Sequence, residues 1–136
     1  MLITKLLTSV KYPGDKYWDI VKTSEDAMFV HGDENKIDYV NQSGICLLNA
    51  SSSLELIGAD IFQFVVDEEE EDIQERLGQI KADEFISRPI NRCLKAVDGT
   101  KKKVEMHGGK VLYNGKVSII TVCRDITDKE YDEEEF

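Results

Sequence analysis

The chain has 136 residues, of which 41% are hydrophobic and 32% are charged. This length and composition fit one globular domain and exclude a disordered or a membrane-embedded protein. The formal net charge of −10 repels phosphate backbones and anionic lipid, so neither nucleic-acid binding nor membrane-surface binding is expected. The acidic runs at 67–72 and 132–135 lack the ligand spacing and the glycine of an EF-hand loop, and we expect them to be solvated.

The cysteines and the N-terminal residues bear on the cellular compartment. Cys46, Cys93 and Cys123 are far apart, lie among apolar residues and form no CxxC pair. This pattern predicts buried, reduced thiols in a cytoplasmic protein without a structural zinc site. The apolar stretch at 1–12 is interrupted by Lys5, is too short to span a membrane and lacks a signal-peptide cleavage site. We therefore expect a cytoplasmic chain, or a soluble piece of a larger one.

Two short helical patterns precede the first predicted strands. Residues 13–15, Pro-Gly-Asp, separate a pattern at 2–10 from a second one that ends near Ser24. The segments 27–31 and 36–40 then predict a β-hairpin around a polar turn. In its second strand, alternation places Ile37 and Tyr39 on the same face.

Several short helices are predicted next. Asn41 and Ser43 are typical N-caps for a helix at 44–48, and Asp60 is one for a segment at 61–65. The clearest amphipathic helix covers 69–82, where the apolar positions recur at helical spacing: Ile73, Leu77 and Ile80.

The last third of the chain has the period of β-strands. Strands are predicted at 86–97, 103–112 and 116–126. Asn114-Gly115 is a strong hairpin signal, because both residues tolerate positive φ, and Gly108-Gly109 indicates a bulge or bend. The strongly apolar final strand is expected at the centre of a sheet. The whole order predicts an α+β domain, with one five-stranded antiparallel sheet and short helices on one face.

Six segments, taken in order, resemble the PAS family of sensory domains. They are Ser24 to Val30, Ile37 to Asn41, Leu56-Ile57-Gly58 with Ile61-Phe62, Asp98-Gly99-Thr100, Tyr113 to Lys116, and Arg124-Asp125-Ile126-Thr127. The last of these resembles the Asp-Ile-Thr signature that closes the domain. The resemblance covers 17–129 and implies a PAS-like fold preceded by an N-terminal helical segment.

The resemblance also implies how the chain is divided. Residues 17–129 form the PAS domain, and 1–16 form an N-terminal segment that packs on the sheet or forms a dimer. Residues 130–136 are an acidic tail or the start of a linker.

A regulatory function follows from the resemblance. PAS domains bind a small molecule or cofactor in a pocket between sheet and helices, form homodimers, and act on an effector through the last strand. Such effectors include histidine kinases of two-component systems, diguanylate cyclases and transcription regulators, and the chain carries the sequence motif of none. The alternative is a ligand-free PAS module for dimerisation or protein docking. An enzyme is not expected, because no nucleophile elbow and no paired carboxylates in apolar surroundings are present.

Two groups of site residues are predicted. Side chains expected to line the pocket, or simply to form the core, are Tyr39, Leu48, Phe64, Leu77, Arg92, Met106 and Ile120. The resemblance implies a signal relay at the exit of the last strand, made by Arg124, Asp125 and Thr127. The simpler interpretation of this exit is a helix N-cap without a signalling role.

No cofactor is identified by the sequence. The stretch 58–64, where light-sensing relatives carry the cysteine that attacks flavin, has no cysteine, and Cys46 is expected in the core. This disfavours covalent flavin and leaves non-covalent flavin open. The helix at 69–82 has no histidine to ligate haem, and we expect His31 and His107 to be surface or turn residues, so neither haem nor a metal site is predicted.

Overall fold

The structure is a computed structural model that describes residues 16–83 and 88–127. The predicted helix at 2–10, the beginning of the strand predicted at 86–97 and the acidic tail lie outside the described residues. No helix within the described part of the chain is long and apolar enough to cross a membrane.

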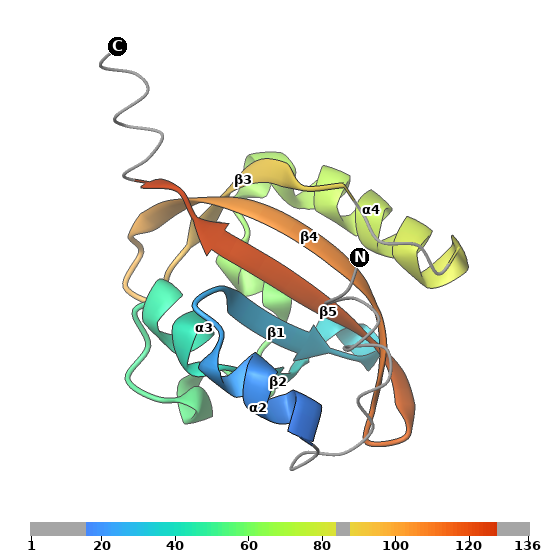
Figure 1. The fold of residues 1–136 in the computed structure, drawn as a ribbon. Helices are drawn as coiled ribbons and strands as arrows, with labels where there is room; N and C mark the ends of the chain where they lie inside the picture. Colours follow the sequence, from blue (N-terminus) through green and yellow to red (C-terminus); the bar gives the residue numbers. More distant parts are fainter. Residues whose placement is uncertain (1–15, 84–87, 128–136) are drawn as a thin grey trace.

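Five antiparallel strands form one sheet (Figure 1). Their order across the sheet is β2-β1-β5-β4-β3, and the pairing confirms that the last strand is central. The strands are β1 (Ala27–His31), β2 (Ile37–Val40), β3 (Ile90–Lys95), β4 (Lys101–Tyr113) and β5 (Lys116–Asp125). The predicted fold class is therefore confirmed, although the described part of β3 is shorter than the predicted strand.

Three α-helices and four short 3₁₀ turns complete the described fold. The α-helices are α2 (Lys16–Thr23), α3 (Gln42–Leu47) and α4 (Glu70–Asp83). The 3₁₀ turns are η1 (Asp33–Asn35), η2 (Ser53–Glu55), η3 (Ile61–Phe64) and η4 (Asp67–Glu69). Helix α3 packs on β1, and α4 packs on β4 and β5.

Local hydrogen bonds explain where the short helices begin. The Asn41 side chain accepts a hydrogen bond of 2.9 Å from the Gly44 amide, and Asp60 accepts one of 2.9 Å from the Phe62 amide. The predicted N-caps Asn41 and Asp60 are therefore confirmed, whereas Ser43 lies inside α3 and its hydroxyl donates to the Ser24 carbonyl. In α4 the predicted apolar stripe is also confirmed, since its three members are buried: Ile73, Leu77 and Ile80.

The sheet has apolar residues on both faces. The inner face, toward α3 and α4, carries the larger cluster, which includes Phe29, Leu48, Leu77 and Met106. The outer face carries a second buried cluster, made by Val21 of α2 with Met28, Val30, Val111, Ile120 and Val122 of the sheet. Helix α2 confirms the predicted helix that ends near Ser24, and it lies on the outer face of the sheet.

A β-bulge in the first hairpin corrects the predicted facing of its side chains. Val30 pairs with Tyr39 and His31 pairs with Ile37, so that Asp38 is an extra residue in β2. Because of this extra residue, Ile37 faces the inner cluster and Tyr39 the outer one. The expectation that both share a face was wrong.

The final hairpin keeps an uninterrupted register. Asn114 and Gly115 have φ of 49° and 79°, which confirms the predicted turn. The bulge considered at Gly108-Gly109 is absent, because Gly108 pairs with Thr121 and Gly109 with Ile120 without a shift. A Cβ atom at Gly108 would stand 3.0 Å from the Ile120 carbonyl oxygen, and this close approach accounts for the glycine.

The cysteines differ in burial. Only Cys123 is fully buried, whereas Cys93 is half-buried and Cys46 is exposed. The prediction of three buried thiols was wrong because Cys46 lies on the solvent side of α3, whose buried side carries Gly44 and Leu47.

Candidate ligand-binding site

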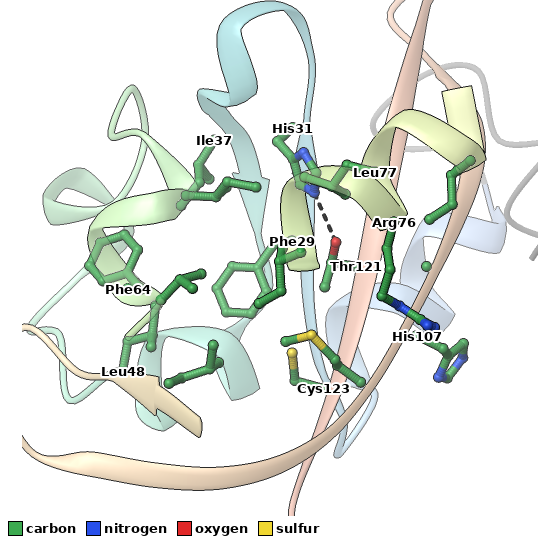
Figure 2. A pocket seen from close by; sticks show the side chains of 17 residues that line it. Phe29, His31, Ile37, Leu48, Phe64, Arg76, Leu77, His107, Thr121 and Cys123 are labelled. Carbon is green, nitrogen blue, oxygen red and sulfur yellow. Dashed lines mark hydrogen bonds between the residues drawn. The ribbon is translucent and has the colours of Figure 1, made fainter. Parts of the chain in front are cut away.

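A cavity lies between the inner face of the sheet and helix α4 (Figure 2). Its volume is about 70 Å³. Most of its wall is apolar, and strands β1, β4 and β5, helix α4 and turn η3 all contribute to it. The central side chains of this wall are Phe29, Ile37, Leu48, Phe64, Leu77 and Met106.

A hydrogen-bonded pair gives this cavity a polar side. His31 Nε2 and Thr121 Oγ1 are 2.8 Å apart, joining β1 to the central strand β5 (Figure 2). The two side chains meet because they occupy diagonal positions on the same face of an antiparallel pair. His31 Nδ1 is buried and has no hydrogen-bond partner in the part of the chain that the structure describes.

His31 is almost fully buried, with 1% of its surface exposed. Burial lowers its pKa to about 4, with a further contribution from the positive charge of Lys81, so the ring is neutral at pH 7. The prediction of a surface or turn histidine was wrong, because every residue of β1 is buried and His31 still belongs to that strand. Alternation from Ala27 and Phe29 would have placed it on the inner face.

Three other polar or ionisable side chains at the cavity differ from His31 in burial or charge. Cys123 lies in the wall, and burial raises the pKa of its thiol to about 12, so it is an uncharged apolar contact at pH 7. Arg76 and His107 come from α4 and β4 and are only partly buried (Figure 2). The Arg76 guanidinium donates a hydrogen bond of 2.7 Å to the Arg88 carbonyl.

The structure brings four of the seven predicted pocket residues together. Leu48, Phe64, Leu77 and Met106 line the cavity. The remaining three are Tyr39 and Ile120, which belong to the outer-face cluster, and Arg92, whose guanidinium contacts the Asp72 carboxylate beside the edge strand β3. Those three do not line this cavity.

The predicted relay residues lie together at the exit of β5. The Asp125 carboxylate accepts a hydrogen bond of 2.9 Å from the Thr127 amide. The Thr127 hydroxyl accepts one of 3.1 Å from the Lys103 amide, and the Ile126 amide donates one of 2.9 Å to the Lys103 carbonyl. Arg124 contacts Asp26 at 3.4 Å. The exit is therefore tied to the neighbouring strand β4.

Metal ligation has no support in this geometry. Within residues 16–83 and 88–127, no three or more His, Cys, Asp or Glu side chains are grouped so that they could hold a metal ion.

Comparison with known families agrees with this architecture. A sequence model described as a PAS domain matches residues 25–128, which is most of the chain. The chain belongs to the PAS domain family. No curated protein matches the sequence significantly.

Solved PAS domains share the fold at low sequence identity. The PAS domain of an HTR-like protein from Haloarcula marismortui is 24% identical with a TM-score of 0.67, and the match covers 79% of this chain and 86% of that one. The PAS domain of nitrogen regulation protein NR(II) from Vibrio parahaemolyticus is 15% identical, with a TM-score of 0.65 and coverage of 79% and 95%. A LuxR-family transcriptional regulator from Burkholderia thailandensis, whose PAS domain was solved in complex with ethanol, is 14% identical, with a TM-score of 0.66 and coverage of 82% and 97%.

Proposed function

We propose that this PAS domain is the sensory module of a signal-transduction protein, and that it binds a small molecule in the cavity between the sheet and α4. The observation that supports this most is the polar pair of the buried His31 and the half-buried Thr121 in a mostly apolar wall. A few polar groups within an apolar cavity are the usual mark of a ligand site. The solved Burkholderia domain in complex with ethanol is an example of a small molecule bound to this fold.

The relay in this proposal uses strand β5. The strand carries Thr121 and Cys123 in the cavity wall and ends at Asp125, where Thr127 is bonded to Lys103. A ligand that moves Thr121 therefore acts on the strand that leaves the domain. Arg124, Asp125 and Thr127 keep the relay role that the family resemblance implies.

The expected partners are a second copy of the chain and an effector. The PAS domain of a two-component sensor histidine kinase and that of the Burkholderia transcriptional regulator share this fold, which supports an effector of the histidine-kinase or transcription-regulator kind. The dimer contact is proposed for the segment 1–16. Ile20 of α2 is 44% exposed, so α2 offers apolar surface that could extend such a contact.

Native mass spectrometry of the purified protein tests the proposal. The expected result is a dimer that carries one small molecule per chain, or one that gains it when a library of small metabolites is added. Removal of residues 1–16 should shift the protein to a monomer. A monomeric full-length chain that retains no molecule from such a library would contradict the proposal.

The second candidate is a ligand-free docking module. The small size of the cavity favours it, since about 70 Å³ is well below the ~300–1,000 Å³ of pockets for drug-sized ligands. A second groove, of mixed polarity, lies between α3 and the strand exit and offers a place for a partner protein. It is lined by Gln42, Leu47, Lys102 and Asp125, among others, and shares Cys123 with the cavity. A bare dimer in the same mass spectra, with a partner captured through this groove, would favour this candidate.

A further inference from the structure

The unpaired nitrogen of His31 indicates what kind of group the cavity binds. Thr121 can either donate its hydroxyl hydrogen to His31 Nε2 or accept the hydrogen of Nε2. In the first case Nδ1 carries a hydrogen and lacks an acceptor, and in the second it lacks a donor. A buried polar atom without a partner is costly, so a ligand group that forms a hydrogen bond with Nδ1 would stabilise either arrangement.

Charge restricts this group further. The His31 ring is neutral at pH 7, and the cavity wall contains no Asp, Glu or Lys among the described residues. Arg76, at the edge, already donates to the Arg88 carbonyl. A buried ammonium group would lose its hydration and gain no negative charge in the wall, while Lys81 and Arg76 would repel it. A buried carboxylate would find matching charges only on Arg76, which is partly buried, and on Lys81, which is outside the wall. A hydroxyl group, which both donates and accepts, fits either state of the His31–Thr121 pair.

The volume of the cavity limits the size of the rest of the ligand. The cavity of about 70 Å³ is roughly half of an apolar cavity that holds benzene. Apart from the polar pair, its wall is made mostly of apolar side chains such as Phe29, Leu77 and Ile80. These observations fit an apolar body of a few carbon atoms, and they exclude a flavin or a haem from the cavity in this form.

Resting on the proposed function, we infer that the cavity binds a small uncharged molecule with one hydroxyl group, of the short-chain alcohol class, and that His31 and Thr121 determine this specificity. The apolar part of the molecule packs between α4 and the sheet. The hydroxyl completes the hydrogen bonds of the pair.

The test is NMR titration of the full chain, labelled with ¹⁵N and with ¹³C in its methyl groups. The probes are 1-propanol, propionate, propylammonium and xenon, the organic ones at equal millimolar concentrations. We expect 1-propanol to shift the His31 ring nitrogens together with the methyl signals of Leu77 and Ile80. Propionate and propylammonium should shift neither, and xenon should shift only the methyl signals.

Matched variants separate the contribution of the polar pair to ligand binding from that of the apolar cavity. Thr121→Val keeps the side-chain shape and removes the hydroxyl, so 1-propanol should bind severalfold to about tenfold more weakly while xenon binding is unchanged. Thr23→Val makes the same change at an exposed helix end, where the Thr23 hydroxyl donates to the Asp19 carbonyl, and should change nothing in the cavity. His31→Phe provides a second variant that removes both ring nitrogens.

Three other outcomes would each contradict a defined part of the inference or of the proposed function. Equal 1-propanol affinity in the parent, Thr121→Val and His31→Phe proteins would show that the polar pair is not used, while the sensory proposal stands. Tighter binding of propionate than of 1-propanol would overturn the uncharged ligand. Exclusion of every probe, xenon included, would contradict both this inference and the proposed function.

Discussion

At the scale of single residues, His31 makes stability depend on pH. Its pKa is lowered from 6.5 to about 4 in the folded protein, mainly by burial, so the unfolded chain binds the extra proton between these two values. The contribution of the neutral ring to the free energy of unfolding is therefore complete above pH 6.5, and it is lost as the pH falls toward about 4. The shift corresponds to a loss of roughly 3 kcal/mol in the free energy of unfolding.

Urea unfolding at a series of pH values checks this. The His31→Phe variant should lose less stability than the parent between pH 6.5 and 4, because the titrating ring is gone. The His107→Gln variant serves as the control, since it removes the other histidine from a partly exposed position. Parallel curves for the parent and His31→Phe would show that His31 does not carry this dependence.

Residue-scale prediction from sequence succeeded where the signal is local. Asn41 was predicted as an N-cap because a short amide before an apolar helix is a local pattern. Its wider role was not predictable: it also accepts from the Met28 amide and donates to the carbonyls of Val21 and Asp26. These bonds join segments whose proximity depends on the whole fold. The His31–Thr121 pair was missed for the same reason, since 90 residues separate its members.

At the scale of elements, two glycines should respond in opposite ways to the same substitution. Gly78 lies within helix α4, and a Cβ atom there would meet nothing within 4 Å. Gly78→Ala should therefore stabilise the protein by about 0.5–1 kcal/mol. Gly115 has φ of 79° in the β4–β5 turn, so Gly115→Ala should destabilise it by about 1 kcal/mol.

Urea denaturation of both variants measures the two signs directly. Each variant is the control for the other, because the added methyl group is identical and a Cβ atom at Gly115 also meets nothing within 4 Å. A stabilising Gly115→Ala would refute the strain assigned to the turn, and a destabilising Gly78→Ala would refute an open helix surface.

Elements were predicted correctly where the sequence signal lies within a few consecutive residues. Helix α4 was found from its apolar repeat and the β4–β5 turn from Asn114-Gly115, both of which are contained in a few consecutive residues. The bulge at Asp38 was not found, because it is defined by the partner strand and not by β2 alone. That single extra residue is also why Tyr39, expected in the pocket, faces the outer cluster.

At the scale of the whole molecule, the cavity and the strand exit share β4 and β5. Gly108 of β4 pairs with Thr121 of β5 in the cavity, and Lys103 of the same strand is bonded to Thr127 at the exit. A methyl group at Gly108 would stand 3.0 Å from the Ile120 carbonyl oxygen and 3.7 Å from Thr121 Oγ1. Gly108→Ala should therefore fill space beside Thr121 and press on the Ile120 carbonyl of β5, the strand on which a ligand would act in the proposed relay.

A double-mutant cycle tests whether this displacement reaches the exit. Substitutions at distant, independent sites add within about 0.3–0.5 kcal/mol. If the two strands transmit the change, Gly108→Ala and Thr127→Val should depart from additivity in the free energy of unfolding by more than about 0.5 kcal/mol. The Lys103 amide, which donates to the Thr127 hydroxyl, should also lose hydrogen-exchange protection in Gly108→Ala alone.

In the control cycle, Thr23→Val replaces Thr127→Val, because the Thr23 hydroxyl is exposed on α2. This cycle should be additive in the free energy of unfolding. Additivity in both cycles, with unchanged protection of the Lys103 amide, would mean that the exit does not sense the cavity. The hydrogen bonds at Asp125 and Thr127 would then only cap the end of the domain, which is the simpler interpretation of this exit. Non-additivity confined to the Thr127 cycle would instead support coupling through the paired strands. Gly108 is paired with β5, and Lys103 of the same strand β4 is bonded to Thr127, so these two strands link the substituted positions.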